Sequence, residues 1–160
     1  MIVVSDTSPL CYLALLDSIE ILHRRFGEVI CPPEVIQECL QKEAPDKLRS
    51  LAGNLPNWLI VRPAPDVHIA GVERLDRGES AAIRLAHHLK ADLTLIDERK
   101  GRQTAVEAGL PVSGVLSVLA DAGQRGWLDF DLMVKRLLTQ TNFRVSPEVI
   151  AAVRRRIAGD

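Results

Sequence analysis

Short runs of apolar and β-branched residues alternate along the chain with longer segments that have helical spacing. The short runs are typical of strands buried on both faces, and we expect them at residues 2–4, 28–31, 58–61, 93–96 and 111–113. Strands separated by helices need crossover connections. The pattern therefore predicts the α/β class, as a three-layer α/β/α sandwich with a central, mostly parallel sheet.

Local signals predict where the helices begin and end. Ser8 and Pro9 are typical of an N-cap and a first helical position, and Gly109 and Gly123 are typical of helix ends. The remaining helices are expected at residues 17–23, 33–41, 44–55, 78–90, 98–108, 115–122, 131–138 and 147–157. We interpret the Pro63–Pro65 stretch as a loop, so residues 1–160 form a single domain.

Composition and charge exclude several classes of protein. The 160 residues are 47% hydrophobic, enough for a core, which excludes a disordered chain. Aromatic residues make up 4%, too few for a row of platforms that stack on bases. The formal net charge is −1, so the chain is not a bulk phosphate binder.

Cysteine and histidine spacing gives no support for disulfides or zinc. The three cysteines form no C-x-x-C pair, and the four histidines form no zinc-binding spacing: Cys11, Cys31, Cys39, His23, His68, His87 and His88. The start of the chain does not resemble a signal peptide, and no apolar run is as long as a membrane span. We expect a soluble cytoplasmic protein.

Four acidic residues fall where the carboxyl ends of parallel strands would meet. Asp6 and Asp97 end the first and fourth predicted strands, Glu38 lies in the helix after the second, and Glu79 opens the helix before the fourth. Ligands bind at this edge of an open α/β sheet. Because all these ligands are oxygens, the set predicts a Mg²⁺ or Mn²⁺ site with Asp6, Glu79 and Asp97 as metal ligands.

Each acid also has a structural interpretation. Asp6 could cap the first helix, although Ser8 would serve that purpose, and Asp97 could cap the helix that follows it. Glu79 could complete a capping box with Asp76. Glu38 falls near the polar side of its helix and could simply be solvated.

Basic residues directly after Asp97 are candidates for phosphate positioning. Arg99 and Arg102 are expected to bind substrate, whereas the alternative is a solvated helix face. Gly78 and Gly101 do not belong to a phosphate-binding glycine motif, and no G-x-S-x-G is present.

Several stretches together resemble PIN domains, in particular a bacterial and archaeal PIN-like subgroup. They are VVSDTSPL at 3–10, LDRGESAAI at 75–83, LIDERKGR at 95–102 and FRVSPE at 143–148. The resemblance implies a PIN-like sandwich, metal-dependent endoribonuclease activity and often the toxin role of a toxin–antitoxin pair. It places catalytic roles on Asp6, Glu38, Glu79 and Asp97, with Thr7 and Ser8 as hydroxyl helpers. The chain departs from the wider family at Leu95, often Thr, and at Glu79, often Asp.

These residues bear on three hypotheses of function. The leading hypothesis is a Mg²⁺- or Mn²⁺-dependent ribonuclease, in which Ser8, Arg99 and Arg102 contact RNA. The alternative is a catalytically weak or inactive PIN-like module that binds RNA or protein. A phospho-accepting receiver domain is disfavoured, because Asp6 has no acidic neighbour and residues 112–114 contain no lysine.

An apolar stripe in the last predicted helix needs a surface to pack on. It consists of Val149, Ile150, Val153 and Ile157, and it could pack on the chain's own sheet. Two terminal helices are more than one sheet face needs, and the resemblance implies a dimer with an antitoxin partner. We therefore expect a homodimer or higher oligomer and an antitoxin protein as possible partner.

Overall fold

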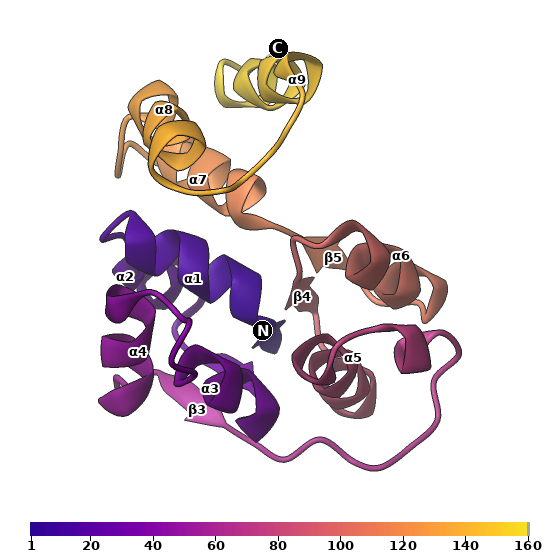
Figure 1. Ribbon diagram of the computed structural model, residues 1–160. Helices are drawn as coiled ribbons and strands as arrows, with labels where there is room; N and C mark the ends of the chain where they lie inside the picture. Colours follow the sequence, from indigo (N-terminus) through magenta and orange to yellow (C-terminus); the bar gives the residue numbers. More distant parts are fainter. Residues whose placement is uncertain (160) are drawn as a thin grey trace.

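The computed structural model describes residues 1–159, which form a five-stranded sheet and nine α-helices (Figure 1). Every neighbouring pair of strands is parallel, in the order β3-β2-β1-β4-β5. All five predicted strands are confirmed. They are β1 (Val3–Ser5), β2 (Val29–Cys31), β3 (Leu59–Val61), β4 (Leu93–Leu95) and β5 (Val112–Ser113).

The helices occupy the predicted intervals, with small shifts at their ends. They are α1 (Thr7–Leu15), α2 (Glu20–Phe26), α3 (Pro33–Cys39), α4 (Asp46–Gly53), α5 (Arg77–Leu89), α6 (Arg99–Glu107), α7 (Val115–Gln124), α8 (Phe130–Gln140) and α9 (Pro147–Ile157). A short 3₁₀ turn, η1 (Val72–Arg74), precedes α5 and was not expected. Within residues 1–159, no helix combines the length and the apolar composition that crossing a bilayer requires.

Helices cover both faces of the sheet, which confirms the three-layer α/β/α sandwich. Successive strand residues point to opposite faces. Val3 and Leu95 belong to the larger core, shared mainly with α1, α7 and α8. Val4 and Ile96 belong to the smaller core, shared with α5 and α6. The central strands are thus buried on both sides.

The strand order reverses between β1 and β4. The chain lays down β1, β2 and β3 in one direction, and residues 62–71 then lead it back to α5 and to β4 on the other side of β1 (Figure 1). Ser5 pairs with Leu95, and the Asp6 N–H donates to the Leu95 carbonyl oxygen at 2.9 Å. In open α/β sheets the crevice at such a reversal is the usual ligand site.

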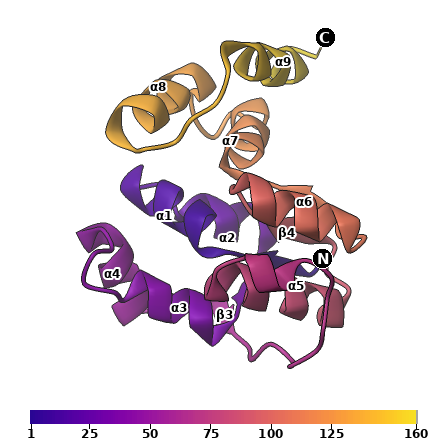
Figure 2. The ribbon, with the colours of Figure 1, turned by 45° about the vertical axis from the view of Figure 1, so that its right-hand side comes forward.

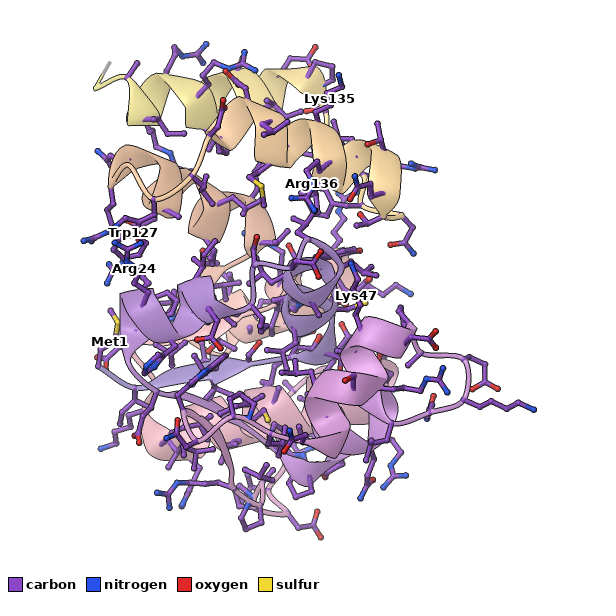
Figure 3. The ribbon with its side chains drawn as sticks, turned by 90° about the vertical axis from the view of Figure 1, so that its left-hand side faces the viewer. Met1, Arg24, Lys47, Trp127, Lys135 and Arg136 are labelled. Carbon is purple, nitrogen blue, oxygen red and sulfur yellow. The ribbon has the colours of Figure 1, made fainter. Side chains whose placement is uncertain are left out.

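The last three helices form a group against α1 and α2, visible in orange and yellow in Figure 2. The Arg24 guanidinium lies 4.2 Å from the centre of the Trp127 ring, where α2 meets the residues after α7 (Figure 3). Arg25 pairs with Asp121 of α7 at 2.5 Å. These contacts attach the group to the side of the sandwich.

The apolar stripe of α9 packs on α7, not on the sheet. Val153 is buried and Ile150 and Ile157 are half-buried, whereas Val149 is 46% exposed. Most of the apolar side chains of α9 therefore pack against other residues of the same chain. The homodimer or higher oligomer stays a prediction.

Three predicted helix boundaries were wrong. Asp6, not Ser8, occupies the N-cap of α1, because the helix begins directly after β1. The helix predicted from residue 17 begins at Glu20, because Asp17 has a φ of 54° and turns the chain. Gly123 lies inside α7, where a Cβ would be 3.1 Å from the Phe130 Cβ, so it permits close packing and does not end the helix.

Two glycines have room for a Cβ, so substitutions there measure the effect of backbone conformation on stability without an effect of packing. Gly126 has a φ of +75° and Gly53 ends α4 without a positive φ, and no atom lies within 4 Å of a Cβ at either position. We expect Gly126→Ala to lower the free energy of unfolding by about 1–2 kcal/mol, because alanine is strained in the left-handed region. Gly53→Ala should raise it by about 0.5–1 kcal/mol. Urea unfolding of both variants measures this, and equal effects would contradict it.

Candidate active site

Asp6 lies at the carboxyl end of β1 and is 1% exposed. Although it occupies the N-cap position of α1, its side chain makes no capping hydrogen bond. Its Oδ1 is buried and has no hydrogen-bond partner among residues 1–159. Burial raises the pKa of Asp6 well above its usual range, and the charges of Glu79, Asp76 and Glu38 raise it further, against the backbone N–H of Thr7.

Glu79 lies in the first turn of α5 and is 7% exposed. Its N–H donates to Asp76 Oδ1 at 2.8 Å, so Asp76 is the N-cap of the helix. The Oε2 of Glu79 is buried and, in the described part of the chain, has no hydrogen-bond partner. Burial, followed by the interaction of the Glu79 carboxyl group with the Asp76 side chain and its negative charge, raises the pKa of Glu79 to about 7.

Glu38 extends from α3 and joins the starts of two other helices. Its Oε2 accepts a hydrogen bond from Thr7 Oγ1 at 2.5 Å, and its Oε1 accepts one from the Gly78 N–H at 3.0 Å. Burial and the charge of Asp76 raise the pKa of Glu38, while these two hydrogen bonds lower it. The side chain is half-buried, so the solvated interpretation was wrong.

Asp97 follows β4 and is half-buried. The Val115 N–H, at the start of α7, donates to its Oδ1 at 3.0 Å and its Oδ2 at 3.2 Å. Asp97 therefore does not cap the helix directly after it, whose N-cap is Glu98. Burial raises the pKa of Asp97 to about 6, although the Val115 N–H and the positive charge of Arg102 oppose the shift.

Three glycines make room for three of these carboxylates. A Cβ on Gly78 would collide with the Glu38 carboxylate. On Gly101 it would lie 2.5 Å from Glu79 Oε2, and on Gly114 it would lie 2.5 Å from Asp97 Oδ1. These roles were not predicted, because the carboxylates that the glycines accommodate come from other parts of the chain. Only the positions of the glycines, at or near the starts of α5, α6 and α7, could be recognised in the sequence.

The structure thus places a set of acids at the carboxyl edge of the sheet, which we call the acidic rim: Asp6, Glu38, Asp76, Glu79 and Asp97. The first four act on one another through their charges, whereas the charges that act on Asp97 are those of Arg102 and Glu98. Across residues 1–159, no three acidic, histidine or cysteine side chains are already close enough together to hold one metal ion. Asp6 and Glu79 nevertheless each present a buried carboxylate oxygen without a partner. Such an oxygen is stabilised by a proton or a cation, and oxygen donors suit Mg²⁺ or Mn²⁺. The donor chemistry therefore fits a hard divalent cation.

The other predicted site residues lie around the acidic rim. Ser8 is half-buried in the first turn of α1 and lines a cleft together with Thr7. Arg102 donates from Nη1 to the Ile96 carbonyl oxygen at 3.0 Å, so its side chain is folded inward beside Asp97. Arg99 is exposed. The substrate-binding roles of Ser8, Arg99 and Arg102 stay predictions.

Leu95, the departure from the wider family pattern, is fully buried in the larger core. It therefore contributes packing and no polar group to the rim.

A comparison with protein families gives one finding that bears on this site. A family model described as a PIN domain matches residues 2–158. No curated protein matches the chain.

The raised pKa values predict how the stability of the metal-free protein depends on pH. Because the folded state holds protons on Asp97 and Glu79 more tightly than the unfolded state does, stability should fall as pH rises from about 4 through about 7. Glu79→Gln removes part of this loss, so its melting temperature should fall less than that of the wild type between about pH 5 and 7. Thermal melts with chelator present measure the difference.

The matched control is Asp66→Asn, an exposed aspartate in the connection after β3, which should follow the wild-type curve. Wild-type and Glu79→Gln melts that change in parallel across this range would contradict the assignment.

Proposed function

This chain belongs to the PIN domain family, whose members are generally nucleases, and we propose that it is a metal-dependent ribonuclease that hydrolyses RNA phosphodiester bonds. The observation that carries the proposal is the pair of buried, unpartnered carboxylate oxygens, Asp6 Oδ1 and Glu79 Oε2, within the described chain. They lie at the sheet edge where the strand order reverses. Leaving such groups without a partner is costly, so their presence supports a function.

Asp6, Glu79 and Asp97 are the residues that would hold Mg²⁺ or Mn²⁺. When bound, such an ion supplies Lewis-acid chemistry: it lowers the pKa of water and neutralises charge on phosphate oxygens. Glu38 fixes the starts of α1 and α5 through its two hydrogen bonds. Arg102 lies beside Asp97 and favours its charged form. The chain's own contribution is thus to position the carboxylates and to leave one buried oxygen each of Asp6 and Glu79 without a hydrogen-bond donor within the described residues.

In this proposal the acidic rim has two states, a partly protonated metal-free state and a metal-bound state. The pKa of Glu79, raised to about 7 chiefly by burial, leaves this carboxyl group partly protonated at neutral pH, which limits repulsion in the metal-free protein. Asp6, Glu79 and Asp97 would give up their protons on holding a divalent cation, whose charge would offset the negative charge that repels RNA. Substrate binding should therefore depend on the metal.

The toxin role extends the proposal, and it is supported by the resemblance of the motifs. In that role the protein would act as a homodimer or higher oligomer and would be inhibited by an antitoxin protein. A short reading frame adjoining the gene, encoding a DNA-binding segment and a disordered tail, would support this extension.

A second candidate function is a catalytically weak or inactive module that binds RNA or protein. The observation that favours it is the absence, within the described chain, of three metal-binding side chains already gathered around one point. Such a module would bind RNA without cleaving it. Cleavage by the pure protein in Mg²⁺ or Mn²⁺ separates the two functions.

Replacing either strand-end aspartate tests the nuclease directly. We expect Asp6→Asn and Asp97→Asn each to reduce RNA cleavage by roughly a thousandfold or more, because an amide keeps the shape but loses the charge that holds the cation. Cleavage of a labelled single-stranded RNA in Mg²⁺ or Mn²⁺ measures the rate, and circular dichroism checks the fold.

Asp66→Asn, purified in parallel, should cleave at the wild-type rate, whereas the cleavage that remains in Asp6→Asn sets the upper limit for contaminating nuclease. Wild-type rates in either site variant would exclude the assignment.

Metal binding should also be visible without any substrate. A cation that relieves the unpartnered oxygens stabilises the folded state, by about 2.7 kcal/mol when its concentration is 100 times its dissociation constant. We expect the melting temperature to rise through a millimolar Mn²⁺ titration and to return with chelator. Glu79→Gln should show a smaller rise, and equal rises in the two proteins would count against Glu79 as a ligand.

A further inference from the structure

A cleft runs along the outer side of the acidic rim, between the start of α1 and the connection from α8 to α9. One part has a volume of about 320 Å³ and is lined by Ser8 and Glu38. The other part has a volume of about 230 Å³ and is lined by Asp97. Tyr12 and Asn142 line both parts, so the two adjoin. The cleft thus passes acidic-rim residues from both sides of the site.

The far wall of the cleft is built by a segment distant in sequence. The connection between α8 and α9 curves back towards α1 (Figures 1 and 2). Tyr12 Oη donates to Asn142 Oδ1 at 3.2 Å, and the Tyr12 and Phe143 rings meet edge to face with centres 5.3 Å apart. Phe143 is 9% exposed, and its N–H donates to Thr141 Oγ1 at 3.1 Å. This segment is therefore anchored, and it holds the next residue, Arg144, at the cleft.

The charges along the cleft are unequal. Arg144 is the one basic side chain among the described residues that line either part. The acidic side chains that line it are Glu38, Glu43, Asp97 and Glu98. Arg144 lines the same part as Asp97 and is exposed to solvent. Arg102, in contrast, is folded inward onto the Ile96 carbonyl.

We propose that this cleft is the track for the substrate strand and that Arg144 is a substrate-positioning residue, binding a backbone phosphate next to the one that is cleaved. The inference rests on the nuclease function proposed above. A planar guanidinium binds phosphate oxygens through two parallel hydrogen bonds, so it fixes the position of the strand as well as attracting it. Because Asp97 and Arg144 face one cavity, a strand held by Arg144 passes the acidic rim.

The test compares three arginine variants in binding and in cleavage. Arg144→Gln removes the charge, Arg144→Lys keeps it, and Arg155→Gln is the matched control, an exposed arginine of α9 that lines neither part of the cleft. Binding of a fluorescent single-stranded RNA is measured by anisotropy in proteins that keep Asp6, with Ca²⁺ in place of Mn²⁺ so that the rim holds a divalent cation of different reactivity, at several salt concentrations. Steady-state cleavage is measured in the otherwise wild-type protein, and thermal melts check folding.

We expect Arg144→Gln to weaken RNA binding about tenfold, as the loss of a charge-assisted hydrogen bond does. The slope of log affinity against log salt should fall by about 0.7, the value for one phosphate contact on a single strand. KM should rise by a similar factor while kcat is kept, since the reacting groups are unchanged. Arg144→Lys should recover most of the binding, and Arg155→Gln should match its parent.

The outcomes separate this inference from the nuclease proposal. If the wild type cleaves RNA and Arg144→Gln changes neither binding nor KM, the cleft assignment is overturned and the nuclease stands. If Arg144→Gln weakens RNA binding but no form of the protein cleaves RNA, the cleft assignment holds and the nuclease falls. If RNA binds to no form of the protein, both are overturned.

Discussion

The hydrogen bond from the Asp6 N–H to the Leu95 carbonyl oxygen, 2.9 Å long, completes the pairing of β1 with β4. These two strands lie on either side of the reversal in strand order, so the chain leaves them in different directions: into α1 after β1 and towards α6 after β4. The edge between them is left open to side chains. Asp6 and Asp97 lie at this edge because the pairing fixes where each strand ends.

The first residues of the helices around this edge leave space for buried carboxylates, and burying these groups lowers the stability of the fold. Asp6 and Glu79 are buried with one oxygen each lacking a partner within residues 1–159, and burial raises the pKa of both. Gly78, Gly101 and Gly114 replace side chains that would fill the space of the carboxylates. Favourable packing elsewhere, such as the two cores on either face of the sheet, offsets this cost. A local conflict that the rest of the fold tolerates is the usual physical mark of a functional site.

The strands and the acids at their ends could be predicted from sequence, because buried parallel strands are short apolar runs and a charge directly after such a run is conspicuous. The N-cap of α1 was wrongly assigned to Ser8, because serine followed by proline is a typical start of a helix. In the structure α1 begins directly after β1, so Asp6 occupies the N-cap position. The glycine roles could not be predicted, because they depend on side chains from other elements. The contact of Tyr12 with Asn142 joins residues 130 positions apart, and no local pattern indicates it.

The placement of positive charge explains how a chain with a net charge of −1 could act on a polyanion. A permanently basic surface at the site would neutralise the carboxylates that have to bind a cation, and it would hold nucleic acid without metal. The chain keeps Arg102 turned inward beside Asp97 and places Arg144 across the cleft, on a separately anchored segment. Under the proposed function, attraction for phosphate would be divided between Arg144 at the wall of the cleft and a divalent cation held by the acidic rim. Such a division would make the affinity of the site for a nucleic-acid strand conditional on the metal.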